Sequence, residues 1–273
     1  MCFKLNLKEV CAKDSNYGKS KKTGDYYGKV FLSNSCGYYQ IILANTTERM
    51  KAVFLQTNTE VIVNAAQVDS GGVVDPYYPS IRGVGYHGEA ESTIDKDGNR
   101  SKEYIYWCGM LNRCYGNKEL ESYKDCIVSE EFHDFSYFQK WFHKQVGRYN
   151  KDFHLDKDIL SGDCKVYAED TCVLVPSEIN MFFAKTGGRT HSNFKDTPYP
   201  VGVSWHKGMR KFKASYNNGG EKHETYHDNE WSAFLAYKQA KENRAKELAE
   251  KWRGQIDDRV YEKLINYKVL LTN

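Results

Sequence analysis

The chain has 273 residues, of which 40% are hydrophobic and 14% aromatic, and its formal net charge is +3. A chain this rich in aromatic residues and this weakly charged is not intrinsically disordered, and its length predicts two or three compact units. No apolar run approaches the roughly 20 residues that cross a bilayer, and the first residues lack the apolar core of a signal peptide. We therefore expect a soluble cytoplasmic protein with no membrane partner.

Charge is unevenly distributed along the chain. Lys and Arg exceed Asp and Glu in residues 1–51 and again in 181–225, whereas acidic residues are in excess in 52–180. Two basic segments around an acidic one suit a polyanion held on both sides of a cation site. Solvated faces explain charge runs equally well when no motif accompanies them.

Cysteines offer a second clue to the class of protein. The chain has eight, and no two of them are spaced as Cys-x-x-Cys. Zinc sites usually contain such a tight pair, and secreted disulfide scaffolds are shorter and denser in cysteine, so we expect reduced thiols and no structural zinc. If zinc is bound, the candidate ligands are Cys108, Cys114, Cys126 and His133.

The N-terminal third combines a basic arm with short strands. Residues 1–25 include the run from Lys19 to Lys22, which is typical of a phosphate-binding arm or of a solvated loop. Four short runs rich in β-branched and aromatic residues follow between 26 and 65, separated by turn-forming residues. They predict a small β-barrel that, with a Gly- and Pro-rich loop, spans 26–100.

The middle of the chain has helical periodicity and then a mixed pattern. Apolar residues at spacings of three and four predict helices over 103–116 and 130–147, with Asp134 as a helix cap. From 150 onwards the pattern predicts a strand, a turn, a second strand and a helix that opens at 176–178. These elements together define a domain over 101–190.

The last third predicts three short strands joined by tight turns, between 201 and 227. A long helix is expected from about Asn229 and a short one ends the chain, which makes 198–273 a sheet packed on a helix. The fold class expected for the whole chain is α+β.

The block PVGVSWHKGMRKFKASY, followed by ETYHDNEWSAFLAYKQAK, resembles the Apetala-type DNA-binding domain of plant ethylene-response factors. Upstream, W-x2-M-L-x-R-C-Y, F-x2-F-x2-W-F, LDKDIL and Y-x4-C-x-L-V-P-x2-I-N follow one another in order. Together with VDPYYPSIRGVGYHGE, they resemble bacteriophage homing endonucleases of the HNH (His-Me finger) class. The resemblance covers about residues 26–270 and implies double-stranded DNA as the partner.

In that family, two strands and a helix hold one divalent cation, Mg²⁺ or Mn²⁺, and a histidine on the first strand acts as the general base. The resemblance places Asp156 at the acidic position and Asn180 on the helix, but Lys157 stands where the histidine is expected. Three interpretations follow. His154 acts as the base from the same face of the strand; Asp156 and Asp158 bind the cation while water or Lys157 handles the proton; or the finger is catalytically inactive.

In the C-terminal sheet, alternation along 210–216 puts Arg210, Phe212, Ala214 and Tyr216 on one face and Lys211, Lys213 and Ser215 on the other, of which Phe212 and Ala214 suit packing on the helix. If this pair packs on the helix, the two lysines face the DNA groove, and Trp205 is as well suited to the core as to a contact. The candidate DNA-binding residues are Trp205, Lys207, Arg210, Lys211, Lys213 and Tyr216.

Three functions are compatible with these features. The first is a metal-dependent endonuclease that nicks or cuts double-stranded DNA, with Asp156, Asp158 and Asn180 as metal ligands and His154, Asp156, Lys157 and Asn180 in catalysis. The second is a DNA-binding protein built on a decayed nuclease, and the third is an RNA-binding module. No heptad pattern indicates a dimer, so we expect a monomer.

Overall fold

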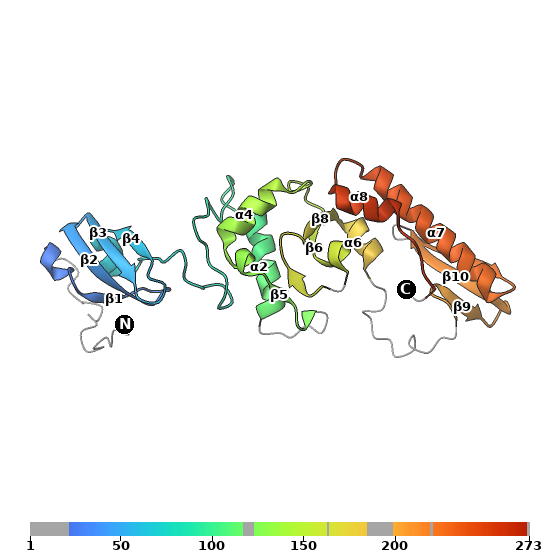
Figure 1. The fold of residues 1–273 in the computed structure, drawn as a ribbon, viewed down its shortest axis with the longest axis horizontal. Coiled ribbons are helices and arrows are strands. Elements are labelled where there is room, and N and C mark those ends of the chain that lie inside the picture. The colour runs from blue at the N-terminus through green and yellow to red at the C-terminus, as the bar shows by residue number, and fades with distance from the viewer. Residues whose placement is uncertain (1–21, 117–122, 163, 185–198, 219–220, 272–273) are drawn as a thin grey trace. The chain divides into compact units, whose positions relative to one another are not determined.

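The computed structural model describes residues 22–116, 123–162, 164–184, 199–218 and 221–271, and it is a mixed α+β structure (Figure 1). Its chain divides into two compact units, Met1–Glu119 with Ile127–Lys140, and Leu120–Cys126 with Trp141–Asn273. The expected basic arm lies almost wholly outside the described residues. Among the residues that are described, no helix is both long enough and apolar enough to span a membrane.

The first unit begins with a four-stranded antiparallel sheet in the order β1-β2-β3-β4. Its strands are β1 (Val30–Leu32), β2 (Tyr38–Thr46), β3 (Arg49–Phe54) and β4 (Glu60–Val63), after a 3₁₀ turn η2 (Thr23–Asp25). The four predicted strands are confirmed, but the predicted barrel is wrong because β1 and β4 do not pair with each other. About eight strands are needed before the interior of a closed sheet has room for side chains, so four short strands remain open.

One face of this sheet is buried. Tyr39, Ile41, Ala52 and Phe54 have no exposed surface, and they cluster with Val68 of a short helix, α1 (Ala65–Ser70). This helix is not among the predicted elements, although its signal is present in the sequence. The side chain of Asn64 accepts a hydrogen bond from the backbone N–H of Gln67, and the Gln67 side chain accepts one from Asn64, which is a capping box.

Three helices follow the irregular segment 74–100, namely α2 (Lys102–Tyr115), α3 (Glu130–His133) and α4 (Phe135–Lys144), with a two-residue strand β5 (Ile127–Val128) before α3. The predicted helix over 130–147 is divided at Asp134, which lies between α3 and α4. Its carboxylate accepts a hydrogen bond from the backbone N–H of Ser136 at 2.8 Å, so the predicted capping role is confirmed. Trp107 of α2 donates to the carbonyl of Phe132 at 2.7 Å and thereby fixes α2 against α3.

The second unit contains the predicted strand, turn, strand and helix. They are β6 (Phe153–Asp156), α5 (Asp158–Ser161), β7 (Val166–Tyr167), β8 (Val173–Pro176) and α6 (Ser177–Phe183). β6 and β8 are antiparallel, from Phe153 opposite Pro176 to Asp156 opposite Val173. We call residues 153–183 the ββα finger. Its core contains Phe153, Leu155, Leu174 and Ile179, all buried.

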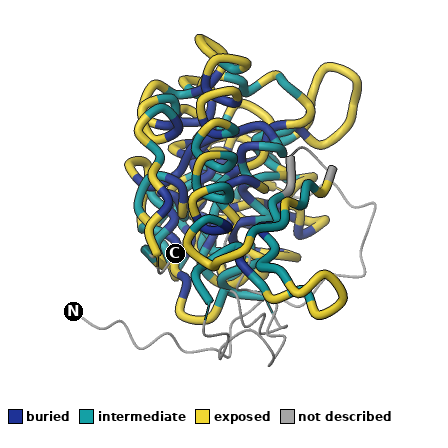
Figure 2. The backbone as a smooth tube through the Cα atoms, turned by 90° about the vertical axis from the view of Figure 1, so that its right-hand side faces the viewer, coloured by how far each residue is buried: buried dark blue, intermediate teal, exposed yellow. Residues whose placement is uncertain are grey.

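The unit ends with a three-stranded antiparallel sheet packed on a long helix. The elements are β9 (Val203–His206), β10 (Lys211–Asn218), β11 (Glu221–His227), α7 (Glu230–Lys251) and α8 (Asp258–Ile265), and the strand order is β11-β10-β9. The three predicted strands and both helices are confirmed. Val203 and Ala214 pack against Ala233 and Phe234 of α7. Figure 2 shows the buried positions alternating with exposed ones along the chain, as expected for elements covered on one face.

The long helix α7 also contacts the ββα finger. Glu178 of α6 accepts hydrogen bonds from Lys251 and Trp252, each at 2.5 Å, and forms an ion pair with Arg244 at 3.2 Å. Burial alone would raise the pKa of Glu178, but these donors hold it below its ordinary value. α7 therefore supports the sheet along its first half and the finger along its second half.

Candidate nucleic-acid interface

The faces of the C-terminal sheet follow from its register. Ala214 lies opposite Val203 on one side and Thr225 on the other, and Phe212 lies opposite Trp205 and His227. Directly opposed residues of an antiparallel pair project to the same face. Because Val203, Phe212 and Ala214 contact the helix cluster, this whole set lies on the face covered by α7. The prediction that Phe212 and Ala214 pack on the helix is confirmed.

Within the described part of the chain no helix packs on the other face of the sheet, and we call it the open face. Lys213 lies opposite Ser204 and Tyr226, and Lys211 lies opposite His206. By alternation and register the members of the open face are Ser204, His206, Lys211, Lys213, Ser215, Lys222, Glu224 and Tyr226. Lys211 and Lys213 therefore share the surface that the sequence analysis assigned to them.

Two of the other candidates lie elsewhere. Trp205 is on the helix side, where its ring meets Phe212 edge-on at 4.9 Å, and it is 41% exposed at the margin of the sheet. Tyr216 is on the same side and stacks on His223 with a centroid distance of 5.3 Å. Trp205 contacts Phe212 but is not a member of the buried cluster, so both alternatives for it remain predictions. Neither ring shares a face with Lys211 and Lys213.

Lys207 and Arg210 lie in the turn between β9 and β10 and are both exposed. Arg210 has a positive φ of 51°, an uncommon conformation for a residue with a side chain. The imidazole Nδ1 of His206 accepts a hydrogen bond from the backbone N–H of Met209 at 3.1 Å, which closes the turn. This turn extends the basic surface of the open face beyond the end of the strands.

Glu224 occupies the middle of the open face and is absent from the predicted site residues. Its Oε1 forms ion pairs with Lys222 at 2.7 Å and with Lys213 at 3.2 Å, and its Oε2 accepts a hydrogen bond from the Tyr226 hydroxyl at 3.0 Å. The hydrogen bonds from Lys222, Lys213 and Tyr226 lower the pKa of Glu224 to about 2. Alternation in KHETYH places Lys222, Glu224 and Tyr226 on one face, and this was the available signal.

The open face and its turn are nevertheless positively charged. Asp228, just after β11, forms an ion pair with Lys211 at 3.2 Å, and its carboxylate is 88% exposed. Against Asp228 and Glu224 stand five basic residues, namely Lys207, Arg210, Lys211, Lys213 and Lys222. The surface thus has an excess of cations, arranged on two strands and a turn that no other described element covers.

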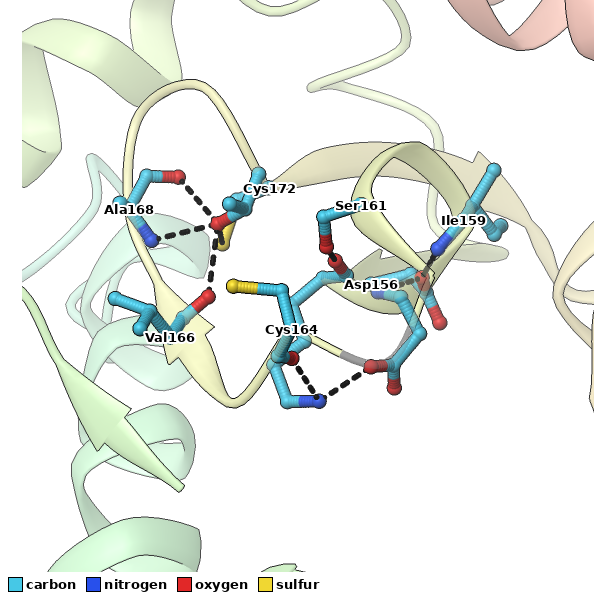
Figure 3. Close-up of polar contacts among 10 residues, drawn as sticks. Asp156, Ile159, Ser161, Cys164, Val166, Ala168 and Cys172 are labelled. Carbon is cyan, nitrogen blue, oxygen red and sulfur yellow. Dashed lines mark hydrogen bonds and ion pairs between the residues drawn. The ribbon is translucent and has the colours of Figure 1, made fainter. Parts of the chain in front are cut away.

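In the ββα finger, Asp156 ends β6 and starts α5. Its Oδ1 accepts two backbone hydrogen bonds, from Asp158 N at 2.8 Å and from Ile159 N at 2.7 Å, as Figure 3 shows for Ile159. The carboxylate therefore caps α5. Burial raises the pKa of Asp156, and the two backbone hydrogen bonds oppose this shift only in part.

Lys157 is buried, with 5% of its side chain exposed. Its Nζ contacts Asp158 Oδ1 at 2.5 Å and donates to the carbonyl of Cys164 at 3.2 Å (Figure 3). It also lies over the ring of Tyr167, 5.6 Å from the centroid. Burial lowers the pKa of Lys157, but the hydrogen bond and charge of Asp158 outweigh burial and the net pKa is raised. Lys157 is thus a cation held inside the loop between β6 and β8.

The loop that follows Lys157 is closed by a second set of hydrogen bonds. The Thr171 hydroxyl bonds to the carbonyls of Val166 and Ala168 at 2.9 and 3.2 Å, and it accepts from the backbone N–H of Ala168 at 2.9 Å. Figure 3 shows Val166 and Ala168 converging on the segment next to Cys172. These bonds hold the loop through a threonine hydroxyl and backbone groups.

His154 and Asn180 complete the predicted catalytic set. His154 is exposed on β6 opposite Val175, and strand alternation puts it on the same face as Asp156. Asn180 is half-buried on α6, and its backbone carbonyl accepts from Ala184 N at 2.9 Å. The strands β6 and β8 and the helix α6 follow one another in the order expected for the finger.

The family resemblance implies a divalent cation in this finger, and the side chains can be tested for their fit to it. Asp156 uses an oxygen to cap α5, and Asp158 is paired with the buried ammonium of Lys157. Across the described ranges, no three His, Cys, Asp or Glu side chains are grouped to hold a metal ion. As arranged here the residues do not fit a cation site, which corrects the metal-binding part of the expected ββα-metal finger.

Comparison with known proteins adds no further assignment. The chain matches no protein-family model, no curated protein and no solved structure.

Proposed function

We propose that this protein binds double-stranded DNA through the open face of its C-terminal sheet. The observation that carries the proposal is a three-stranded sheet with one face packed on α7 and a basic, uncovered opposite face. A major groove about 12 Å wide admits a β-ribbon, and lysines on the ribbon neutralise phosphates on the groove walls. The basic turn at Lys207 and Arg210 extends this surface toward the DNA backbone.

A salt titration of binding tests the proposal. We would measure the affinity for a 30-base-pair duplex by fluorescence anisotropy, comparing wild type with the double variant Lys211→Ala/Lys213→Ala. Each lost phosphate contact lowers the slope of log affinity against log salt by about 0.9, so the double variant should lose about 1.8 and bind roughly tenfold more weakly at low salt. Lys246→Ala, an exposed lysine on α7, is the matched control.

Two outcomes contradict this proposal. One is a wild-type protein that does not bind the duplex at low salt. The other is a double variant that binds with the same slope as Lys246→Ala. Competition with single-stranded and double-stranded RNA in the same assay tests the RNA-binding hypothesis, because an RNA-binding protein would release the DNA probe.

A metal-dependent endonuclease is the second candidate. It is favoured by the order of β6, β8 and α6, with Asp156 at the end of the first strand and Asn180 on the helix. It ranks below DNA binding because the nearby carboxylates already have partners. His154, exposed beside Asp156 on the strand, is the group that would exchange a proton with water there.

The endonuclease hypothesis is tested on supercoiled plasmid with Mg²⁺, Mn²⁺ or EDTA. Asp156→Asn preserves the oxygen that caps α5 while removing its charge, so it separates a catalytic role from a capping role. Nicking that needs metal and is lost in Asp156→Asn, His154→Ala and Asn180→Ala, but not in the exposed control Asp97→Asn outside the finger, supports a nuclease. Binding without nicking under every condition supports DNA binding alone.

A further inference from the structure

Glu224 has an unusual position for an acidic residue on a basic surface. Among the open-face residues, it is the only carboxylate, and it lies on β11 opposite Ser215. Its side chain is 27% exposed, so it is neither buried in the sheet nor free in solvent. A carboxylate whose only role was to reduce the positive charge of the surface would not need three hydrogen-bonding partners. The arrangement of these partners is therefore informative about the role of Glu224.

The acceptor capacity of Glu224 is only partly used. A carboxylate has about four acceptor positions, two on each oxygen. The ammonium groups of Lys213 and Lys222 bond to Oε1, and the hydroxyl of Tyr226 bonds to Oε2. One acceptor position therefore remains on Oε2. Because the three donors come from two strands, they hold the carboxylate in one orientation on the open face.

The donors next to Glu224 also have capacity to spare. Each ammonium carries three N–H donors, and one of them on Lys213 and one on Lys222 bond to Glu224. The centre of the open face therefore presents a fixed acceptor beside two sets of donors. In the major groove a C·G pair presents the complementary pattern, with the N4 amino donor of cytosine beside the O6 and N7 acceptors of guanine.

We propose that Glu224 recognises a cytosine, with Oε2 accepting a hydrogen bond from the N4 amino group, while Lys222 donates to the paired guanine. This inference rests on the proposed DNA binding by the open face. Guanine and thymine present acceptors that repel a carboxylate, and adenine places its N7 acceptor beside its N6 donor. Glu224 thus adds base specificity to a surface whose lysines by themselves bind phosphate.

Selection from a random duplex library tests the inference. Wild type should enrich a C·G pair at one position, and changing that pair should weaken binding by about tenfold. Glu224→Gln should move the preference at this position to adenine, because a carboxamide pairs with N6 and N7 together. Asp228→Asn, which removes the same charge beside the same face, should select the wild-type sequence.

A second measurement uses wild-type protein alone, so it does not depend on the folding of a variant. In the selected duplex the cytosine is replaced by N4-methylcytosine, whose methyl group occupies the major-groove side of the amino group. Affinity should fall about tenfold at this position. Unchanged affinity, a wild type without sequence preference, or an unchanged preference in Glu224→Gln overturns the assignment, whereas wild type that binds no DNA overturns the proposed function itself.

Discussion

The carboxylates of Glu224 and Asp156 each accept hydrogen bonds from nitrogen donors, but the donors belong to different parts of the chain. On the open face the donors to Glu224 are side chains of β10 and β11, and their ammonium groups keep N–H donors that Glu224 does not use. In the finger the donors to Asp156 are backbone N–H groups of α5, which can leave only if the helix unwinds. Similar residues are therefore available for recognition in one region and used for structure in the other.

Electrostatics separates the two regions in the same way. Hydrogen bonds from lysines and a tyrosine lower the pKa of Glu224, whereas burial raises the pKa of Asp156. The surroundings of Glu224 therefore stabilise its negative charge, whereas the surroundings of Asp156 destabilise the negative charge of that carboxylate. A ligand with donor groups would find a charged acceptor ready on the sheet, and the finger would have to rearrange to offer one.

The largest effect on stability is expected where the C-terminal sheet packs closely on α7. Gly202 precedes β9 with φ at +75°, and a Cβ added there would overlap the ring of Tyr237 on α7. Gly202→Ala should lower the free energy of unfolding by about 3 kcal/mol, measured by urea denaturation. Gly208→Ala, in the exposed turn where an added Cβ meets only His206 at 3.5 Å, should change it little. Equal stability of the two variants would show that the sheet does not depend on close packing at α7.

The next largest effect on stability is expected for Lys157, the buried cation of the finger. Lys157→Met keeps the length of the side chain but removes the donor to Cys164 and the partner of Asp158. We expect a loss of about 2 kcal/mol in unfolding free energy, with DNA affinity unchanged, because the open face is not involved. Lys165→Met is the exposed control. If Lys157→Met unfolds at the same urea midpoint as wild type, the loop does not need this charge.

Removing the charge of Asp156 is expected to raise the free energy of unfolding, whereas the Gly202 and Lys157 variants lower it. A carboxyl whose pKa is raised on folding binds protons more tightly in the folded protein, so its contribution to stability falls as the pH rises above its ordinary value of 3.8. Asp156→Asn keeps the oxygen that caps α5 and should stabilise the protein at pH 7, with the gain disappearing toward pH 3. Asp156→Ala should destabilise it by about 1 kcal/mol through loss of the cap. Destabilisation by both would indicate that the negative charge itself is needed.

The smallest effect is expected for the acid stability of the open face. Because folding lowers the pKa of Glu224 from 4.5 to about 2, its contribution is present above 4.5 and is lost as the pH falls toward 2. The difference in urea midpoint between wild type and Glu224→Gln should therefore shrink over this interval, and high salt should reduce it at any pH. A difference that stays constant with pH would contradict the ion pairing on the open face.

Much of the local structure could be predicted from residue patterns. Alternation identified the strands of both sheets, and spacings of three and four identified α2, α7 and α8. Departures occurred where a local signal was overlooked or competed with a longer pattern. The capping box at Asn64, which marks the start of α1, was overlooked. At Asp134 one helix ends and another begins, although the apolar periodicity of the sequence continues through this residue.

Closure of the N-terminal sheet could not be predicted because it depends on strand number and on which edges meet. The same limit applies to Trp205, whose face is set by the register of β9 against Phe212, whereas alternation along β10 already places Tyr216 on the side of Phe212. For the finger, the sequence places Asp156, Lys157 and Asp158 in a row, but the partner of each charge depends on how the loop folds back.

The sequence by itself determined the order of elements, the basic character of the last third and the packing side of β10, because these follow from local periodicity and composition. Only the tertiary structure decided that Glu224 of β11 pairs with Lys213 of β10 and that Lys157 is enclosed near Cys164. The physical reason is that burial and ion pairing depend on distances across neighbouring strands and within folded loops, and these distances exist only after strands and loops have packed.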